Sequence, residues 1–286
     1  MSVLQGDWEA VDDRRCELGE GARFLGDQGF VLVDLLDGRL YSTSGQPRAG
    51  MRLEHHLDVP LGAVAPSGDG WIAAAGEGVA VLSDDGPRWL AEPAAGRSVP
   101  MRMNDGVADP AGRFWAGAMP YDDVPGAGFL LRVDRDGSVD VVLEGLTIPN
   151  GPAISPDGRR LYLSDTPTGR IRVHALDPQT GELGAASDFA HVEDGGPDGM
   201  TVDAEGCLWS AIWGAGRLHR YAPDGTLVEQ IPVPVRQPTS IALSDAAPYR
   251  VIVTSATHGL DEPADHDGRV ITAPVAVAGL RACSFG

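Results

Sequence analysis

The chain has 286 residues, and its 38 glycines and 22 prolines are spread along its whole length. That share is well above the average of roughly 12% and indicates many turns. With 22 basic and 41 acidic side chains the net charge is −19, which excludes nucleic acid and anionic membranes as expected partners.

Cysteine usage and the N-terminal residues indicate the compartment. The three cysteines, Cys16, Cys207 and Cys283, are far apart and form no CxxC pair. We therefore expect neither a disulfide scaffold nor a thiolate zinc site, and a reducing compartment fits. The first fifteen residues are polar and acidic, and no run reaches the length of a signal peptide or a membrane span. We expect a soluble cytoplasmic protein.

Six short apolar runs recur along the chain, each after a turn-rich cluster, and each is predicted to be a buried strand. They cover residues 30–34, 71–75, 114–117, 161–165, 208–212 and 251–254. Their spacing of 40 to 47 residues predicts an all-β fold, a six-bladed β-propeller with four strands in each blade. Six such units fill the chain, so we expect one domain over residues 1–286. A β-sandwich also has short strands, but it rarely shows six evenly spaced units.

Turn signals fall between these runs. They are Asp37-Gly38, Asp85-Gly86, Asp136-Gly137 and Asp224-Gly225. Such pairs favour tight β-hairpins, and we expect them to mark the outer hairpins of the blades.

Four oxygen-bearing side chains share one phase of the repeat. Asn104, Asn150 and Asp198 each precede the glycine of the next hairpin by eight residues, and Glu20 does so by nine. Equal phase predicts an equal position on each blade, in the first and innermost strand. We therefore expect these four side chains to point at a common place in the axial tunnel.

The chemistry of this set favours a hard cation. Two carboxylates and two amides, without histidine or cysteine, suit Ca²⁺, Mg²⁺ or Mn²⁺, and the two negative charges balance one dication. Asn or Asp before Gly is also a common turn pair, but four in register favour a site. Because calcium takes six to eight oxygens, such a set leaves positions for water and substrate, which suits catalysis.

At these residues the sequence resembles the senescence marker protein / gluconolactonase / regucalcin-like family. The similarity covers nearly the whole chain in order. The matching segments are Leu18-Gly-Glu-Gly21, Arg102-Met-Asn-Asp-Gly106 with Asp109-Pro-Ala-Gly-Arg113, Ile148-Pro-Asn-Gly151 with Ser155-Pro-Asp-Gly158, Pro197-Asp-Gly-Met200 with Asp203-Ala-Glu-Gly-Cys-Leu-Trp209, and Val235-Arg-Gln-Pro-Thr-Ser240.

The resemblance implies hydrolysis of a small-molecule sugar lactone with one divalent metal ion. Glu20, Asn150 and Asp198 would hold the ion, which we expect to be Ca²⁺, with Zn²⁺, Mg²⁺ and Mn²⁺ as alternatives. Arg102 and Asn104 would bind substrate, as would Asp122, where many relatives carry glutamate. The family's usual ending is altered here at Gly268-Arg-Val-Ile271, so the closing strand is the hardest segment to place.

A mechanism follows from these assignments. Asp198 would also act as the catalytic base, taking a proton from the attacking water. No GxSxG, P-loop or HExxH motif offers another route. Two rivals stay open: a phosphotriesterase on the same metal propeller, and a calcium-binding propeller that is not an enzyme.

Overall fold

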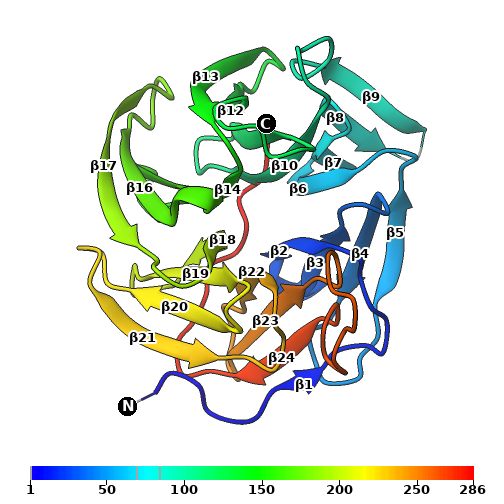
Figure 1. Cartoon of the computed structure of the whole chain (residues 1–286), viewed down its shortest axis with the longest axis vertical. Helices are drawn as coiled ribbons and strands as arrows, with labels where there is room; N and C mark the ends of the chain where they lie inside the picture. Colours follow the sequence, from blue (N-terminus) through cyan, green and yellow to red (C-terminus); the bar gives the residue numbers. More distant parts are fainter. Residues whose placement is uncertain (1, 69, 84) are drawn as a thin grey trace.

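Six four-stranded antiparallel sheets surround a central axis, which confirms the predicted six-bladed β-propeller (Figure 1). This is a computed structural model that describes residues 2–68, 70–83 and 85–286. Among these residues there is no α-helix, only the short 3₁₀ helices η1 (Gly26–Gln28) and η2 (Thr166–Thr168). No helix in the described ranges is long and apolar enough to cross a membrane.

The strands follow one another outward from the axis in the first five blades. Blade 1 contains β2 (Gly19–Phe24), β3 (Phe30–Asp34), β4 (Arg39–Thr43) and β5 (Arg52–His56); blade 2 contains β6 (Leu61–Ser67), β7 (Gly70–Ala75), β8 (Gly78–Ser83) and β9 (Gly86–Ala91). Blade 3 contains β10 (Met101–Ala108), β11 (Phe114–Pro120), β12 (Gly128–Val133) and β13 (Val139–Leu146). Blade 4 contains β14 (Pro149–Ile154), β15 (Arg160–Asp165), β16 (Arg170–Leu176) and β17 (Leu183–His191); blade 5 contains β18 (Gly196–Val202), β19 (Leu208–Trp213), β20 (Arg217–Tyr221) and β21 (Leu227–Pro232).

Blade 6 closes the ring with both ends of the chain. It contains β22 (Pro238–Leu243), β23 (Arg250–Ser255), β24 (Ile271–Pro274) and, outermost, β1 (Glu9–Ala10). The closing strand therefore begins at Ile271, the last residue of the altered segment, and pairs with an N-terminal strand of two residues. Gly268 lies before it with a φ of +79°, as a turn residue.

Burial explains why the six apolar runs were recognisable. Each corresponds to the second strand of a blade, which is covered by neighbouring blades on both faces; β11, for example, is buried at every residue. The fourth strands lie at the rim, and most of their residues are half-buried or exposed, as in β13 and β17. A strand buried on both faces has a continuous apolar sequence, whereas a rim strand does not.

The turn prediction was wrong for one of its four pairs. Asp136-Gly137 and Asp224-Gly225 join third and fourth strands, and Gly86 begins the fourth strand of blade 2, as expected. Asp37-Gly38 instead lies between β3 and β4, the second and third strands of blade 1. The reason is that the outer connection of this blade is a longer loop, residues 44–51.

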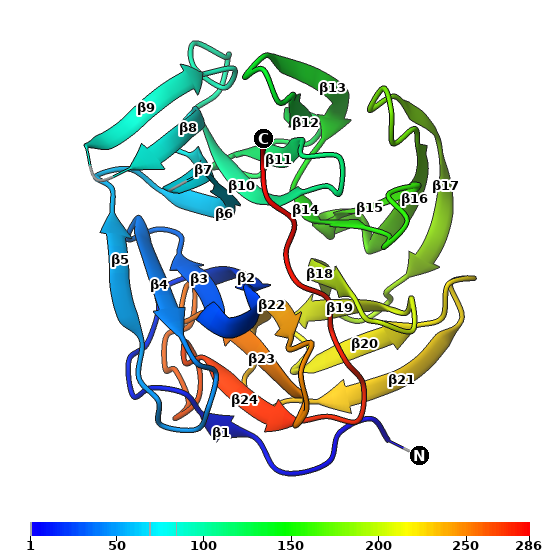
Figure 2. The ribbon, with the colours of Figure 1, turned by 180° about the vertical axis from the view of Figure 1, so that it is seen from behind.

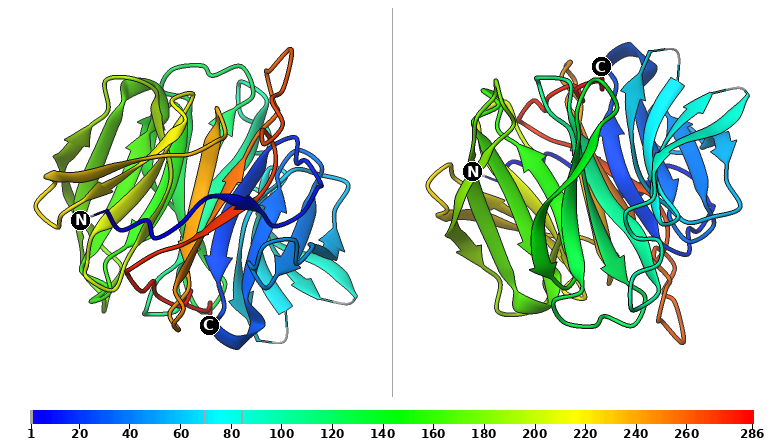
Figure 3. Two further views of the ribbon diagram at one scale, coloured as in Figure 1. Left: turned by 90° about the horizontal axis from the view of Figure 1, so that it is seen from below. Right: turned by 90° about the horizontal axis from the view of Figure 1, so that it is seen from above.

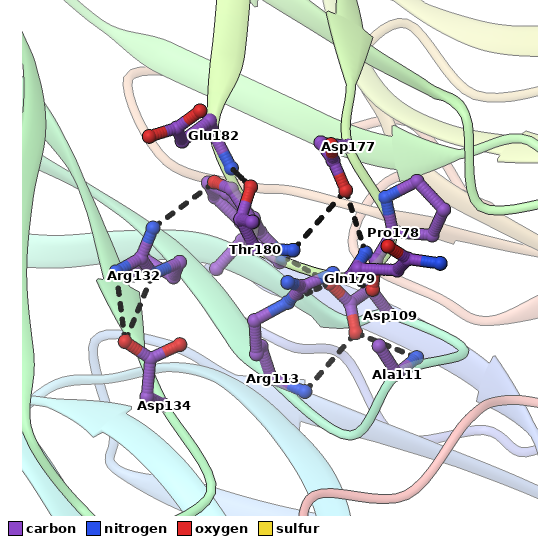
Figure 4. Close-up of polar contacts among 12 residues, drawn as sticks. Asp109, Ala111, Arg113, Arg132, Asp134, Asp177, Pro178, Gln179, Thr180 and Glu182 are labelled. Carbon is purple, nitrogen blue, oxygen red and sulfur yellow. Dashed lines mark hydrogen bonds and ion pairs between the residues drawn. The ribbon is translucent and has the colours of Figure 1, made fainter.

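A buried aspartate fastens the hairpin between the first two strands of blades 3 and 5. In blade 3, Asp109 Oδ2 accepts hydrogen bonds from Arg113 Nε at 2.7 Å and Trp115 Nε1 at 2.9 Å. Arg113 also donates to the carbonyl of Pro178 in blade 4, so the same group ties two blades together (Figure 4). In blade 5, Asp203 Oδ2 accepts from Trp209 Nε1 at 2.8 Å and Arg220 Nε at 2.9 Å.

The C-terminal residues 280–286, here called the C-terminal strap, cross one mouth of the tunnel (Figure 2). The backbone N–H of Ala282 donates to the carbonyl of Phe24, and that of Phe285 donates to the carbonyl of Pro66. Both acceptors lie near the C-terminal ends of innermost strands. The side views place the C-terminus at one flat face of the disc (Figure 3). The opposite face, where the innermost strands begin, is not crossed by this strap and is here called the open face.

Candidate metal centre

Each of the four residues predicted in phase lies early in an innermost strand and beside a β-bulge. The ladder register shifts between Glu20 and Arg23, Met103 and Gly106, Asn150 and Ala153, and Pro197 and Met200. A bulge interrupts the alternation of side chains and re-aims one of them. Glu20, Asn104, Asn150 and Asp198 are all buried, with exposed fractions of 3 to 5%.

Hydrogen bonds connect the two amides to Arg102 in one chain. Arg102 Nη1 donates to Asn104 Oδ1 at 2.7 Å, and Asn104 Nδ2 donates to Asn150 Oδ1 at 2.6 Å. Asn150 Nδ2 donates in turn to Thr166 Oγ1 at 3.0 Å, whose hydroxyl donates to the carbonyl of Pro197. This series of hydrogen bonds fixes the orientation of the Asn104 and Asn150 side-chain amides, because each amide nitrogen already has an acceptor. Thr166, which sequence reasoning missed, therefore orients the side chain of Asn150 from η2.

The two carboxylates of the set, Glu20 and Asp198, are both buried in the tunnel, with Arg102 as the cation whose charge acts on both. Burial, and then the charge of Asp105, raise the pKa of Glu20 to about 8. Burial, and then the charges of Glu20 and Asp105, raise the pKa of Asp198 well above its usual range. Asp198 Oδ1 is buried and has no hydrogen-bond partner in the described part of the chain. Buried, mutually repelling carboxylates with an unused oxygen are the environment that a bound cation would relieve.

Asp105 is a third tunnel carboxylate that the sequence analysis did not single out. It is 1% exposed, and its Oδ1 accepts from Arg23 Nη2 at 3.0 Å and from the backbone N–H of Gly106 at 2.8 Å. Arg23 lies in blade 1 and Asp105 in blade 3, so their ion pair joins two blades that are not neighbours. The sequence does distinguish Asp105: the residue that follows the tunnel residue is glycine in blades 1, 4 and 5, but aspartate in blade 3.

Asp122 occupies a different environment from the buried residues. It lies on the exposed turn that joins β11 and β12, at the end of the strand that pairs with Arg102. The side chains of this turn that act on Arg102 are those of Tyr121 and Asp123, the latter with a φ of +50°. The structure thus brings Glu20, Arg102, Asn104, Asn150 and Asp198 together and leaves Asp122 at the open face.

A second group of potential metal ligands lies in blade 5 and is better explained without an ion. Asp203, Glu205 and Cys207 could place one ligand atom each within 4.8 Å of the others. However, Arg220 Nη2 lies 2.7 Å from Asp203 and 2.6 Å from Glu205, so a guanidinium already occupies the cation position. This group is the buried hairpin fastening of blade 5.

The fold and the tunnel residues together define a six-bladed propeller of the lactonase and regucalcin type. The family model described as the SMP-30/Gluconolactonase/LRE-like region matches residues 18–257, and the chain belongs to this family.

Named relatives and solved structures agree with that membership. A pentonolactonase of Haloferax volcanii is 35% identical over 250 residues, which is 86% of this chain and 84% of the relative. A 6-deoxy-6-sulfogluconolactonase of Pseudomonas putida is 35% identical over 235 residues, 80% of each chain. The crystal structure of a calcium-binding protein, regucalcin, from Agrobacterium tumefaciens has a TM-score of 0.90 at 28% identity, and covers 100% of this chain and 99% of its own.

Proposed function

We propose that this protein hydrolyses sugar lactones of the aldonolactone type with one divalent metal ion, expected to be Ca²⁺. The observation that supports this most is the buried pair Glu20 and Asp198, whose raised pKa values and unused oxygen fit a dication. The relatives named as lactonases support the substrate class, and the regucalcin structure described as calcium-binding supports the ion.

Three side chains would hold the ion. Glu20 and Asp198 would supply two negative charges, and Asn150 would supply Oδ1, which is kept facing the tunnel because its Nδ2 is bound to Thr166. A bound divalent ion polarises a carbonyl and stabilises the negative charge that develops on its oxygen, an effect worth several kcal/mol.

The remaining residues would orient substrate and move the proton. Asp198 would accept the proton of the attacking water on its carboxylate and return it to the ring oxygen as the ring opens, leaving a hydroxy acid. Arg102 would bind the substrate through Nη2, which donates no hydrogen bond within the described residues, while Nη1 holds Asn104. Asn104 would support this position, and Asp122 at the open face would contact a sugar hydroxyl. Orientation of this kind lowers the barrier because the reactants are already aligned.

A substrate panel tests the proposal. Five- and six-membered aldonolactones, each assayed with Ca²⁺, Mg²⁺, Mn²⁺ or Zn²⁺ and with a chelated control, should give the highest kcat/KM values. A paraoxon-like phosphotriester should be slower, because a polar pocket leaves buried groups unpaired with an apolar substrate. Faster phosphotriester turnover would favour the rival hydrolase. Ion binding without any turnover would favour a calcium-binding propeller.

The substrate contacts have their own prediction. We expect Arg102→Ala and Asn104→Ala to lower kcat/KM by about 10- to 1000-fold while the ion stays bound, because the proposed ligands are untouched. Kinetics on a lactone, with metal content measured in the same samples, check this. Arg97→Ala is the matched control, since Arg97 lies on the exposed loop between β9 and β10 and pairs with Glu144 of β13. Wild-type kinetics in both tunnel variants would contradict the assignment.

A further inference from the structure

The unassigned carboxylate of Asp105 is held rigidly in the tunnel. Arg23 donates from Nη2 to Asp105 Oδ1, and it also donates to the backbone carbonyls of Gly106 at 2.6 Å and Ala22 at 2.7 Å. The guanidinium is therefore fixed by two peptide groups in addition to the carboxylate. An Arg fixed in this way presents a defined geometry rather than a mobile charge.

One oxygen of Asp105 is left without a partner. Oδ2 is buried and no described residue donates to it with hydrogen-bond geometry, as is true of Asp198 Oδ1. Burial raises the pKa of Asp105, and the backbone N–H of Gly151 lies close enough to the carboxylate to oppose that rise. Asp105 directly follows Asn104, whose side chain donates to Asn150, and its charge acts on both Glu20 and Asp198, so it lies beside the proposed metal ligands. Buried carboxylate oxygens in native proteins nearly always have a donor, and an orphan in a polar chamber indicates an ordered water or an ion nearby.

The ion pair also forms a boundary within the tunnel. Beneath it lies a cavity of about 290 Å³ that Arg23 lines together with Leu280–Cys283 of the C-terminal strap. Glu20, Asn150 and Asp198 do not line this cavity. Arg23 therefore lies between the carboxylate of Asp105 and the tunnel end that the C-terminal strap crosses.

Blade 3 has Asp105 at the position after the tunnel residue, where blades 1, 4 and 5 have glycine, and the space around this position differs between blades. A Cβ added to Gly151 in blade 4 would lie 2.5 Å from the carbonyl oxygen of Asp198, and one added to Gly199 would lie 2.5 Å from that of Thr239. The neighbouring blade thus leaves no room for a side chain at this position of blades 4 and 5, whereas a Cβ at Gly21 of blade 1 would meet nothing nearer than 3.4 Å. At Asp105 the room exists, and the side chain that fills it is a carboxylate with a fixed partner.

We propose that Asp105 is a positioning residue of the metal centre, whose Oδ2 accepts a hydrogen bond from a water bound to the ion on the side of the C-terminal strap. Arg23 holds the carboxylate in place and offsets part of its charge, so that Glu20 and Asp198 supply the two charges that balance the dication. This inference rests on the proposed metal site. It adds a residue and a bound water to that site.

Calorimetric titration of Ca²⁺ and Mn²⁺ into the full chain tests the proposal. Asp105→Asn keeps the shape of the side chain but replaces the carboxylate with an amide, whose oxygen is a weaker acceptor and whose nitrogen cannot accept a hydrogen bond. We expect ion affinity to fall about 10- to 100-fold, the usual cost of losing a supporting partner. The double variant Arg23→Gln with Asp105→Asn restores the wild-type net charge of the tunnel. We expect its affinity to stay low, because the water has still lost its acceptor.

The outcomes separate the inference from the function on which it rests. Wild-type affinity in Asp105→Asn, or recovery in the charge-balanced double variant, would overturn the hydrogen-bonding role. If Asp105→Asn does not fold, luminescence lifetimes of Tb³⁺ bound to the unaltered chain in H₂O and D₂O count the waters on the ion. At least one should remain when the hydroxy acid product is bound, and none would overturn the inference. A wild-type chain that binds no ion would instead overturn the proposed function.

Discussion

Replacement of Asp198 by asparagine is expected to abolish both ion binding and lactone hydrolysis. The change removes a ligand charge and the proposed base at once. We expect ion affinity to fall by more than about 100-fold, beyond the usual effect of a supporting residue. We expect kcat/KM to fall by more than about 1000-fold, within the range for loss of a general base. Glu20→Gln should lower affinity similarly, but it should retain more activity at saturating ion because Asp198 remains.

The pH dependence of ion binding provides an independent check of the same residues. Burial and the charge of Asp105 raise the pKa of Glu20 to about 8 in the ion-free chain, so the ion must displace a proton at lower pH. Affinity should therefore rise as the pH increases from about 6 to about 8.5 and then level off. In Glu20→Gln this rise should be reduced. Calorimetry in buffers of different ionisation enthalpy measures the released proton, and a pH-independent affinity in the wild type would contradict the assignment.

Much of the architecture was predictable because the burial of each blade leaves the same pattern in the sequence of every repeat. Strands such as β11 and β19 are buried on both faces, so their sequences are continuously apolar and recur at blade spacing. The phase of Asn150 and Asp198 relative to Gly158 and Gly206 reflects the same length of innermost strand before each hairpin, although the hairpin of blade 4 is one residue longer than that of blade 5. Innermost strands of equal length place equal residues at equal depth in the tunnel, which is why a count of residues predicted a shared position for these side chains.

What the sequence did not reveal depends on contacts between distant segments. Asp105 follows Asn104 and precedes a glycine, so it had the pattern of a turn residue, and its partner Arg23 lies 82 positions away in another blade. The strand β1 has only two residues, and its pairing with β24 depends on ring closure rather than on local pattern. Thr166 acts through a single hydroxyl on η2. None of these features carries a period or a composition signal.

Replacement of Asp203 by alanine is expected to cause a large loss of stability. Asp203 is fully buried, and its carboxylate accepts from Trp209 Nε1, from Arg220 Nε and from the backbone N–H groups of Glu205 and Cys207. Without it, a guanidinium with a side chain only 6% exposed keeps Glu205 alone as a carboxylate partner. Breaking one side of a buried ion pair costs about 3–5 kcal/mol.

Ser155 offers the matched control, because it occupies the same hairpin position in blade 4. Its Oγ accepts from the backbone N–H of Arg160 at 2.9 Å, but Tyr162 stands where blade 5 has Trp209, so no buried cation depends on it. Ser155→Ala should cost only about 1 kcal/mol, the net worth of an ordinary hydrogen bond. Differential scanning calorimetry of both variants measures the difference, at about 2–4 °C in Tm for each kcal/mol. Because this hairpin lies at the opposite end of β18 from Asp198, folded Asp203→Ala protein should keep its ion affinity. Equal Tm values for the two variants would mean that the aspartate does not fasten the blade.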